Sequence, residues 1–223
     1  DALIVYCDGD ADPSYQVWNG TTWTPGGSSV NLASANNCEY VKLASNPTSD
    51  EIVLVSRDTG AGYEAQVWNG SSWANSRTLG SMSDVAHEGI GVEYEESGNQ
   101  AMVVVSNGGT SGFVWTTWDG LSWSVPTPQA LGDDFEWGRL RADVGTDKLA
   151  LCYIDQDADV GTLVWDGNSW ATYSAAANER DTIGNANTGR AADCAYETTA
   201  GRDGYLMLPY SDTAAAQYQY FNG

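Results

Sequence analysis

The sequence predicts an all-β fold, a β-propeller-like array of about five antiparallel repeats of roughly 50 residues, one of them incomplete. Three observations predict it. A tryptophan-rich hairpin motif returns at nearly constant spacing, an apolar run precedes each copy, and no segment shows the period of an amphipathic helix. Repeats of this length are typical of blade-type architectures, in which each unit is one small sheet.

The hairpin motif reads Trp-Asn/Asp-Gly, then any residue, then Ser/Thr-Trp. It occurs within residues 16–23, 66–73, 117–123 and 164–170, and a fifth copy breaks off at 220–223. Asn-Gly or Asp-Gly between apolar strands is a strong signal for a two-residue type I′ turn, because both turn residues need positive φ. The motif therefore predicts a tight hairpin with tryptophans on both arms.

A two-residue turn at Asn19-Gly20 fixes the expected pairing of the first hairpin. Trp18 would lie opposite Thr21, and Gln16 opposite Trp23. The two tryptophans would then share one face of the hairpin on a diagonal, close enough to touch.

An apolar strand precedes each hairpin. These runs are continuously apolar rather than alternating, which predicts strands covered on both faces, as between two neighbouring blades. They occupy residues 2–6, 52–55, 101–105, 149–153 and 206–208. A further strand comes before each run from the second unit onward, across turn-forming Gly, Asn, Asp, Ser and Pro residues.

The repeat units do not divide the chain evenly. We place them at about 1–23, 24–73, 74–123, 124–170 and 171–223 of a single domain. The first unit lacks its own leading strand, and the last stops before its fourth strand. Either the N-terminal hairpin completes the last unit, or a neighbouring copy supplies the missing strands, since unpaired strand edges attract partner strands.

Four cysteines are spaced for two disulfides. In the aligned repeats, Cys7 and Cys152 lie on one face of one strand, and Cys38 and Cys194 lie on one face of the next. The pairing Cys7–Cys38 and Cys152–Cys194 would join neighbouring units at similar heights, and we predict it over the other two connectivities. Disulfides indicate an oxidising, extracellular or cell-surface setting.

The charge balance limits the partners. Nine basic residues stand against 30 acidic ones, a formal net charge of −21. This argues against nucleic acid and anionic membrane surfaces as partners. A membrane-spanning helix needs an apolar run of about 18 residues, and the sequence has none that long. Direct membrane insertion is therefore not expected.

Two aspartate-rich loops are candidates for calcium. Carboxylates at alternate positions of a tight loop suit a hard cation, and the spacing resembles the calcium loops of integrin-type propeller repeats. Neither loop has the glycine and distal acidic residue that usually complete the shell, and turn-favouring aspartates facing water are the alternative. The candidate ligands are Asp8, Asp10, Asp12, Asp155, Asp157 and Asp159. No cofactor other than calcium is expected.

Catalysis is not predicted. A glycoside hydrolase would need two carboxylates in a cleft, and the candidates are only what so acidic a chain contains by chance. They are Glu93, Glu95, Glu96, Asp133, Asp134 and Glu136. His87 is the only histidine, so no Ser-His-Asp arrangement is available.

The tryptophan hairpin resembles the Trp-rich repeats of secreted bacterial and archaeal β-propeller proteins, among them propeller lectins. The resemblance covers the hairpin and the apolar strand before it. It implies a propeller whose aromatic hairpins either pack between blades or stack on sugars. The candidate ligand-binding residues are Trp18, Trp23, Trp68, Trp73, Trp118, Trp123, Trp165 and Trp170.

Three functions therefore remain open. The first is a non-catalytic extracellular structural or adhesive module of a cell-surface assembly or filament, which self-associates through its incomplete units. The second is a lectin or adhesin that binds cell-surface glycans. An enzyme of the glycoside hydrolase kind is the third and least supported.

Overall fold

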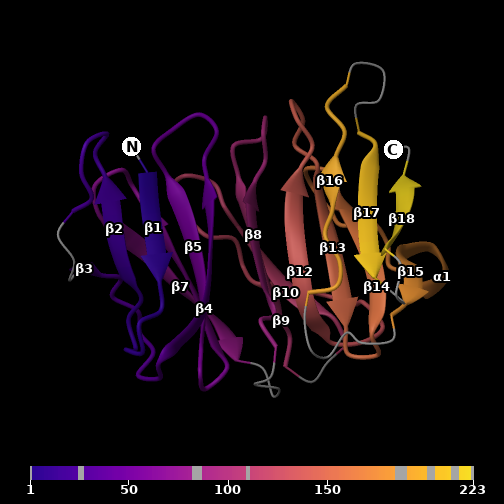
Figure 1. Ribbon diagram of the computed structural model, residues 1–223, viewed down its shortest axis with the longest axis horizontal. Coiled ribbons are helices and arrows are strands. Elements are labelled where there is room, and N and C mark those ends of the chain that lie inside the picture. Colours follow the sequence, from indigo (N-terminus) through magenta and orange to yellow (C-terminus); the bar gives the residue numbers. More distant parts are fainter. Residues whose placement is uncertain are drawn as a thin grey trace.

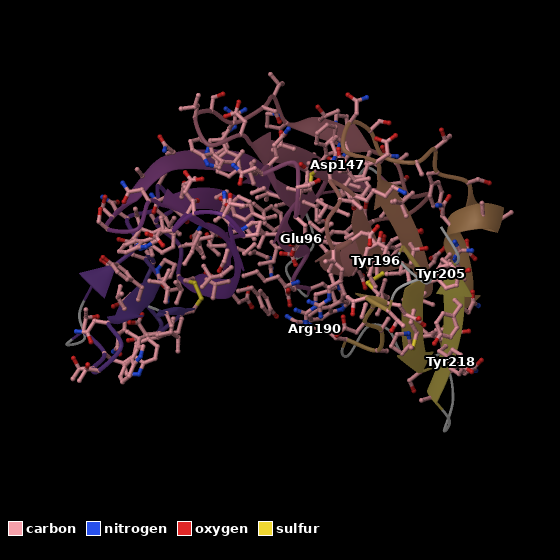
Figure 2. All side chains as sticks on the ribbon, turned by 90° about the horizontal axis from the view of Figure 1, so that it is seen from above. Glu96, Asp147, Arg190, Tyr196, Tyr205 and Tyr218 are labelled. Atoms are coloured by element: carbon pink, nitrogen blue, oxygen red, sulfur yellow. A yellow bond between two sulfur atoms is a disulfide. The ribbon has the colours of Figure 1, made fainter. Side chains whose placement is uncertain are left out.

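The computed structural model describes residues 2–24, 28–81, 87–108, 111–183, 190–199, 204–211 and 216–221. They form five antiparallel sheets that follow one another along the chain. The sheets stand side by side in sequence order (Figure 1), and seen from above they form an open arch (Figure 2).

Each sheet is a meander of strands in sequence order. The first sheet contains β1 (Ala2–Tyr6), β2 (Ser14–Trp18) and β3 (Ser28–Ser29). The second contains β4 (Cys38–Ser45), β5 (Ile52–Asp58), β6 (Gly62–Trp68) and β7 (Trp73–Ser81). The third contains β8 (Ile90–Tyr94), β9 (Ala101–Ser106), β10 (Phe113–Trp118) and β11 (Thr127–Gln129).

The remaining two sheets continue the pattern. The fourth contains β12 (Phe135–Ala142), β13 (Leu149–Asp155), β14 (Asp159–Trp165) and β15 (Glu179–Thr182). The last contains β16 (Ala195–Tyr196), β17 (Leu206–Ser211) and β18 (Ala216–Phe221). The one described helix, α1 (Ala175–Asn178), is a single turn before β15 and far too short to cross a membrane.

The arch is built on the first strands of the middle sheets. β8 packs against both β4 and β12. Within the described chain, the first sheet has no strand equivalent to these, and the last sheet has no fourth strand. β1 pairs with β2 alone, so the expectation that the N-terminal hairpin completes the last sheet is wrong.

Burial follows the position of a sheet in the arch. β9 and β13 are buried at every residue, and β5 at every residue but its first, because sheets cover both of their faces. β1 has no fully buried residue, and β17 alternates between buried and more exposed positions. The expectation that all five apolar strands are covered on both faces is therefore correct for the middle sheets and wrong for the two terminal ones, which have one neighbour each.

The hairpin turn differs from the predicted one. Trp18 pairs directly with Trp23, so the loop between them has four residues, and the expected pairs with Thr21 and Gln16 are wrong. The Asn19 side chain explains the difference, since its Oδ1 accepts the backbone N–H groups of residues 21 and 22 at 3.0 and 2.9 Å. Only Gly20 needs positive φ, at 92°. An amide or carboxylate side chain thus replaces the second left-handed residue of a type I′ turn.

The same loop recurs in the next three hairpins. Asn69, Asp119 and Asp166 each accept two backbone N–H groups within their own loops. For the two aspartates these bonds favour the ionised form and lower the carboxyl pKa. The last two residues of the fifth copy lie outside the described part of the chain.

Two disulfides link neighbouring sheets. Cys7, just after β1, is bonded to Cys38 at the start of β4. Cys152 in β13 is bonded to Cys194, just before β16. This is the pairing that the aligned repeats predict. Each bond ties a terminal sheet to its only neighbour.

Candidate functional site

A cavity of about 360 Å³ lies between the fourth and last sheets. It forms because β16 has only two residues and leaves the end of β17 uncovered, where a single bridge joins Ala192 to Tyr210. Its volume is within the range of small-molecule sites. The main side chains that line it are those of Trp137, Arg139, Ile154, Arg190, Asp193 and Tyr210.

Trp137 of β12 forms the aromatic wall of this cavity. The His87 ring meets it edge-on with centroids 5.9 Å apart, and the Arg190 guanidinium lies 5.7 Å from its ring centroid. Its indole Nε1 is buried and has no hydrogen-bond partner in the described part of the chain. A buried N–H donor without an acceptor is energetically costly.

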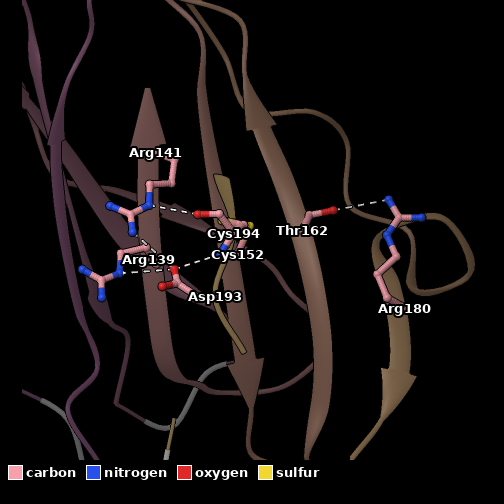
Figure 3. Close-up of a disulfide and its surroundings, with 7 residues drawn as sticks. All are labelled: Arg139, Arg141, Cys152, Thr162, Arg180, Asp193 and Cys194. Atoms are coloured by element: carbon pink, nitrogen blue, oxygen red, sulfur yellow. Dashed lines mark hydrogen bonds and ion pairs between the residues drawn. A yellow bond between two sulfur atoms is a disulfide. The ribbon is translucent and has the colours of Figure 1, made fainter. Parts of the chain in front are cut away.

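The Cys152–Cys194 disulfide fixes one side of the cavity (Figure 3). Both cysteines are buried, within an apolar cluster that includes Ile154, Leu208 and Tyr210. The disulfide therefore holds the segment before β16 against β13 at a point where β-pairing is almost absent.

Arg139, Arg141 and Asp193 form a charged rim (Figure 3). Arg139 Nε and Arg141 Nη2 each lie 3.5 Å from Asp193 Oδ1. Arg141 Nε also donates to the Cys194 carbonyl at 2.9 Å, and the Cys194 N–H donates to Asp193 at 2.8 Å. The Asp193 side chain is nevertheless 50% exposed, so these groups remain open to a ligand.

A buried ionic cluster supports the rim from behind. Glu88 is 1% exposed and is paired with both Lys42 and Arg190. Lys42 Nζ also donates to the carbonyls of Ile90 and Gly138, both at 2.7 Å. Burial lowers the pKa of Lys42 to about 8, and the attraction of Glu88 opposes this shift. One lysine thus ties β4 to β8 and β12, and the shared glutamate holds Arg190 beside Trp137.

This arrangement suits a neutral, polyhydroxylated ligand. An aromatic face packs on apolar C–H surface. A carboxylate accepts from hydroxyl groups, and guanidinium groups donate to hydroxyl oxygens in a fixed plane. Apolar walls with a few fixed polar groups are typical of small-molecule sites.

The eight hairpin tryptophans lie elsewhere. Trp68, Trp118, Trp165 and Trp170 are buried in the junctions between sheets. Their partners in those junctions include aromatic rings and, for Trp118 and Trp165, the carboxylates of Glu51 and Glu95. Trp73 and Trp123 are half-buried in the same junctions, against Tyr15 and the Asn75 carbonyl. Only the first pair, Trp18 and Trp23, lies on a sheet with no preceding neighbour. Sugar binding by these tryptophans remains a prediction.

The predicted calcium loops make hydrogen bonds within the protein. Asp8 accepts from the Ser14 hydroxyl at 2.6 Å, and Asp12 accepts from the Leu32 N–H at 2.9 Å. In the other loop, Asp155 accepts from the Asp159 N–H, also at 2.9 Å. Asp10 and Asp157 complete the two loops. Among the described residues no three acidic, His or Cys side chains are grouped as a metal site. Calcium binding remains a prediction.

Asp155 differs from the other aspartates of these loops in its carboxyl pKa, which burial and acidic neighbours raise strongly. Desolvation raises its carboxyl pKa to about 7, and the charges of Asp159 and Asp133 act in the same direction. Hydrogen bonds from the backbone of residues 157 and 159 oppose the shift.

At least three of the six carboxylates considered for glycoside hydrolysis make contacts within the protein. Glu95 accepts from Trp165 Nε1 at 2.8 Å, and burial raises its pKa. Glu136 is paired with His87 Nδ1 at 3.1 Å. Asp133 accepts from the backbone N–H of the next residue. These groups position neighbouring sheets and loops.

The cavity residues were not predicted from the sequence. One available signal was the alternation of Arg139 and Arg141, since residues two apart on a strand share a face. Asp193 and Tyr210 come from distant segments, which the Ala192–Tyr210 bridge joins and the Cys152–Cys194 disulfide holds against β13.

No protein-family model matches the sequence, and no curated protein matches it. Several solved lectin structures are, however, similar to the structure of this chain. The BP39L lectin from Burkholderia pseudomallei superposes with a TM-score of 0.62 at 10% identity, over 99% of this chain and 63% of that one. The Aleuria aurantia lectin is a fungal lectin described as a six-bladed β-propeller with a fucose recognition mode. It superposes with a TM-score of 0.58 at 16% identity, over 98% of this chain and 69% of that one.

The SapL1 lectin, solved with alpha methyl fucoside, gives a TM-score of 0.55 at 14% identity, over 99% of this chain and 72% of that one. An Aleuria aurantia lectin mutant is matched over only 55% of its length. The fold is of the β-propeller kind. At these identities the likeness concerns the fold alone, and the ring of sheets is open in the chain described here.

Proposed function

We propose that this chain is a non-catalytic carbohydrate-binding protein of the propeller-lectin kind, and that the cavity beside Trp137 binds one neutral sugar residue. The observation that carries the proposal is the position of Trp137 next to the Arg139–Asp193 pair in a cavity of about 360 Å³. Fold similarity to fucose-binding lectins supports the ligand class.

A 6-deoxyhexose such as fucose is the first ligand to test. Its methyl group and C–H surface would face Trp137, and its hydroxyls would meet Asp193 and the arginines. A net charge of −21 disfavours the approach of anionic glycans from a distance.

The test is calorimetric titration with α-methyl fucoside, followed by a glycan array if the fucoside does not bind. The expected result is binding by the wild-type chain that Asp193→Asn and Trp137→Ala each weaken at least about tenfold, the scale of losing one important contact. Asp193→Asn changes an exposed rim group and leaves folding intact. Trp23→Ala is the matched control, since it removes an exposed tryptophan far from the cavity.

The alternatives give different results. If Trp23→Ala abolishes binding and Trp137→Ala does not, the sugar site lies on the hairpins instead. If no glycan binds the wild-type chain, the carbohydrate proposal is wrong.

Related expectations belong to the same proposal. We propose that each sheet is one propeller blade, that the repeat units set out above are the building blocks of one domain, and that the protein acts outside the cell or at its surface. Two disulfides support that location. Calcium in the aspartate loops would be tested by calorimetry after treatment with a chelator.

A structural role in a self-associating assembly is the second candidate. This role is the first of the three functions expected from the sequence. The similar lectin structures favour carbohydrate binding over it. What favours self-association is the uncovered faces of the first and last sheets.

A further inference from the structure

No described residue of another sheet covers the outward face of the first sheet. The rings of Trp18 and Trp23 lie 5.5 Å apart on this face, and Trp23 is 43% exposed. Ile4, on the same face, is 46% exposed. Among the described residues, no aromatic ring of another sheet contacts this tryptophan pair.

The equivalent tryptophans of the second and fourth sheets are covered by an aromatic ring of the preceding sheet. Tyr15 of the first sheet lies 5.6 Å from Trp68 and 5.9 Å from Trp73. Trp115 of the third sheet lies 5.0 Å from Trp165. The same kind of contact therefore occurs twice within one chain.

Tyr15 and Trp115 occupy the same place in the repeat. Each comes three residues before the first tryptophan of its own hairpin. That tryptophan pairs with the first residue of the preceding strand in each of the first four sheets. In the last sheet Phe221 pairs with Leu206 in the same way, so Tyr218 is the equivalent of Tyr15 and Trp115.

In the described part of the chain, no sheet follows the one that carries Tyr218. It is 64% exposed and points to the same side of its sheet as its two equivalents. Figure 2 shows it on the last sheet, at the end of the arch opposite the first sheet. The chain thus carries one half of the aromatic contact at each end.

We propose that copies of this chain associate head to tail, with Tyr218 of one copy packed on the Trp18–Trp23 pair of the next. A second copy is the occupant that the repeat register favours, because it continues a contact already made twice inside the chain. A head-to-tail contact that does not close gives an open helical assembly. This inference does not depend on sugar binding.

Charge sets how such an assembly responds to salt. Each copy carries a net charge of −21, so copies repel one another at low ionic strength. Salt screens this repulsion and strengthens apolar contacts. Association should therefore increase with salt, the opposite of an interface held by ion pairs.

The test is sedimentation velocity of the wild-type chain and two variants over a concentration series, in 50 mM and 500 mM salt. Trp23→Gln alters only the Trp18–Trp23 face of the first sheet, which is the head. Tyr218→Gln alters only the Tyr218 face of the last sheet, which is the tail. Both residues are exposed, so folding is retained. Leu121→Gln, at an exposed position on the third hairpin, is the matched control. The expected result is wild-type association that grows with salt, unchanged in the control and at least about tenfold weaker in either variant alone.

Mixing the two variants is the decisive step. One intact head and one intact tail remain, so the mixture should form a pair of unlike copies and stop there. A wild-type chain that stays monomeric at all concentrations and salts overturns the proposal. So does self-association by Tyr218→Gln alone at wild-type strength, because it would mean that two tryptophan faces meet. A mixture that stays monomeric while the wild-type chain associates also overturns it.

Discussion

The indole Nε1 of Trp165 donates a hydrogen bond of 2.8 Å to Oε1 of Glu95, across the junction between the third and fourth sheets. Glu95 directly follows β8 and is buried. Desolvation raises its carboxyl pKa, and the indole N–H acts against that shift by favouring the ionised form. This bond satisfies a buried carboxylate with a tryptophan of the repeat motif.

Trp165→Phe should lower the free energy of unfolding by about 1.5–3 kcal/mol, because it leaves the Glu95 carboxylate without its indole partner and removes packing. Chemical denaturation measures the change. Trp23→Phe is the control, with an expected change within about 0.5 kcal/mol, because the Trp23 ring is exposed. Equal effects of the two substitutions would show that the Trp165–Glu95 bond contributes nothing specific.

The Lys42 amine should make stability depend on pH above 8. Its pKa is about 8 in the folded chain and near 10.5 when unfolded. The unfolded chain therefore binds more protons between these values, and stability rises with pH across this window. The stability advantage of the wild type over Lys42→Met should grow by about 1–2 kcal/mol between pH 7 and pH 10. Urea titrations at the two pH values measure it, and a constant difference would contradict the shifted pKa.

The two disulfides should differ in their effect on the cavity. Cys152→Ser/Cys194→Ser and Cys7→Ser/Cys38→Ser should each cost about 2–5 kcal/mol of stability. They close loops with sequence separations of 42 and 31 residues, so their chain-entropy terms are similar. Only the first pair holds the backbone that positions Arg141 and Asp193.

Binding of α-methyl fucoside, measured below the melting temperature of both double variants, separates the two roles. It should be lost in Cys152→Ser/Cys194→Ser and kept in Cys7→Ser/Cys38→Ser. Equal binding by both variants would mean that the disulfide beside the cavity does not shape the site.

The side chain that closes each hairpin loop should be replaceable only by its close relative. Asn69→Ala should cost about 0.5–1.5 kcal/mol, since two backbone N–H groups lose their acceptor. Asn69→Asp should be nearly neutral, because Asp119 and Asp166 make the same bonds in the third and fourth hairpins. Thermal unfolding of the two variants measures the difference. A loss of stability with aspartate as large as with alanine would contradict the loop-closing role.

The repeat pattern predicts most of the fold. The spacing of the hairpins and the apolar strands before them gives the meander of each sheet, and the aligned cysteines give both disulfides. The predicted type I′ turn was wrong because the Asn19 side chain closes a four-residue loop, so no second left-handed residue is needed. An Asn-Gly pair is favoured in both kinds of loop, so the sequence does not distinguish them.

The site was harder to predict than the fold. Trp137 stands outside the repeated hairpins, and Asp193 precedes a strand of two residues. The cavity exists because the last sheet departs from the repeat at β16. A repeat pattern describes what the units share, so it carries little information about a site made by a departure from it.

The arch has a consequence for how the protein opens. The substantial contacts between described strands join each sheet to itself or to the next sheet along the chain, and none of that size joins the first sheet to the last. Such a molecule behaves as a linear array rather than a ring, with cooperativity that falls toward its ends. Backbone amides of β1 and β18 should exchange with solvent deuterium fastest and those of β9 slowest, so the terminal sheets fray while the centre stays folded.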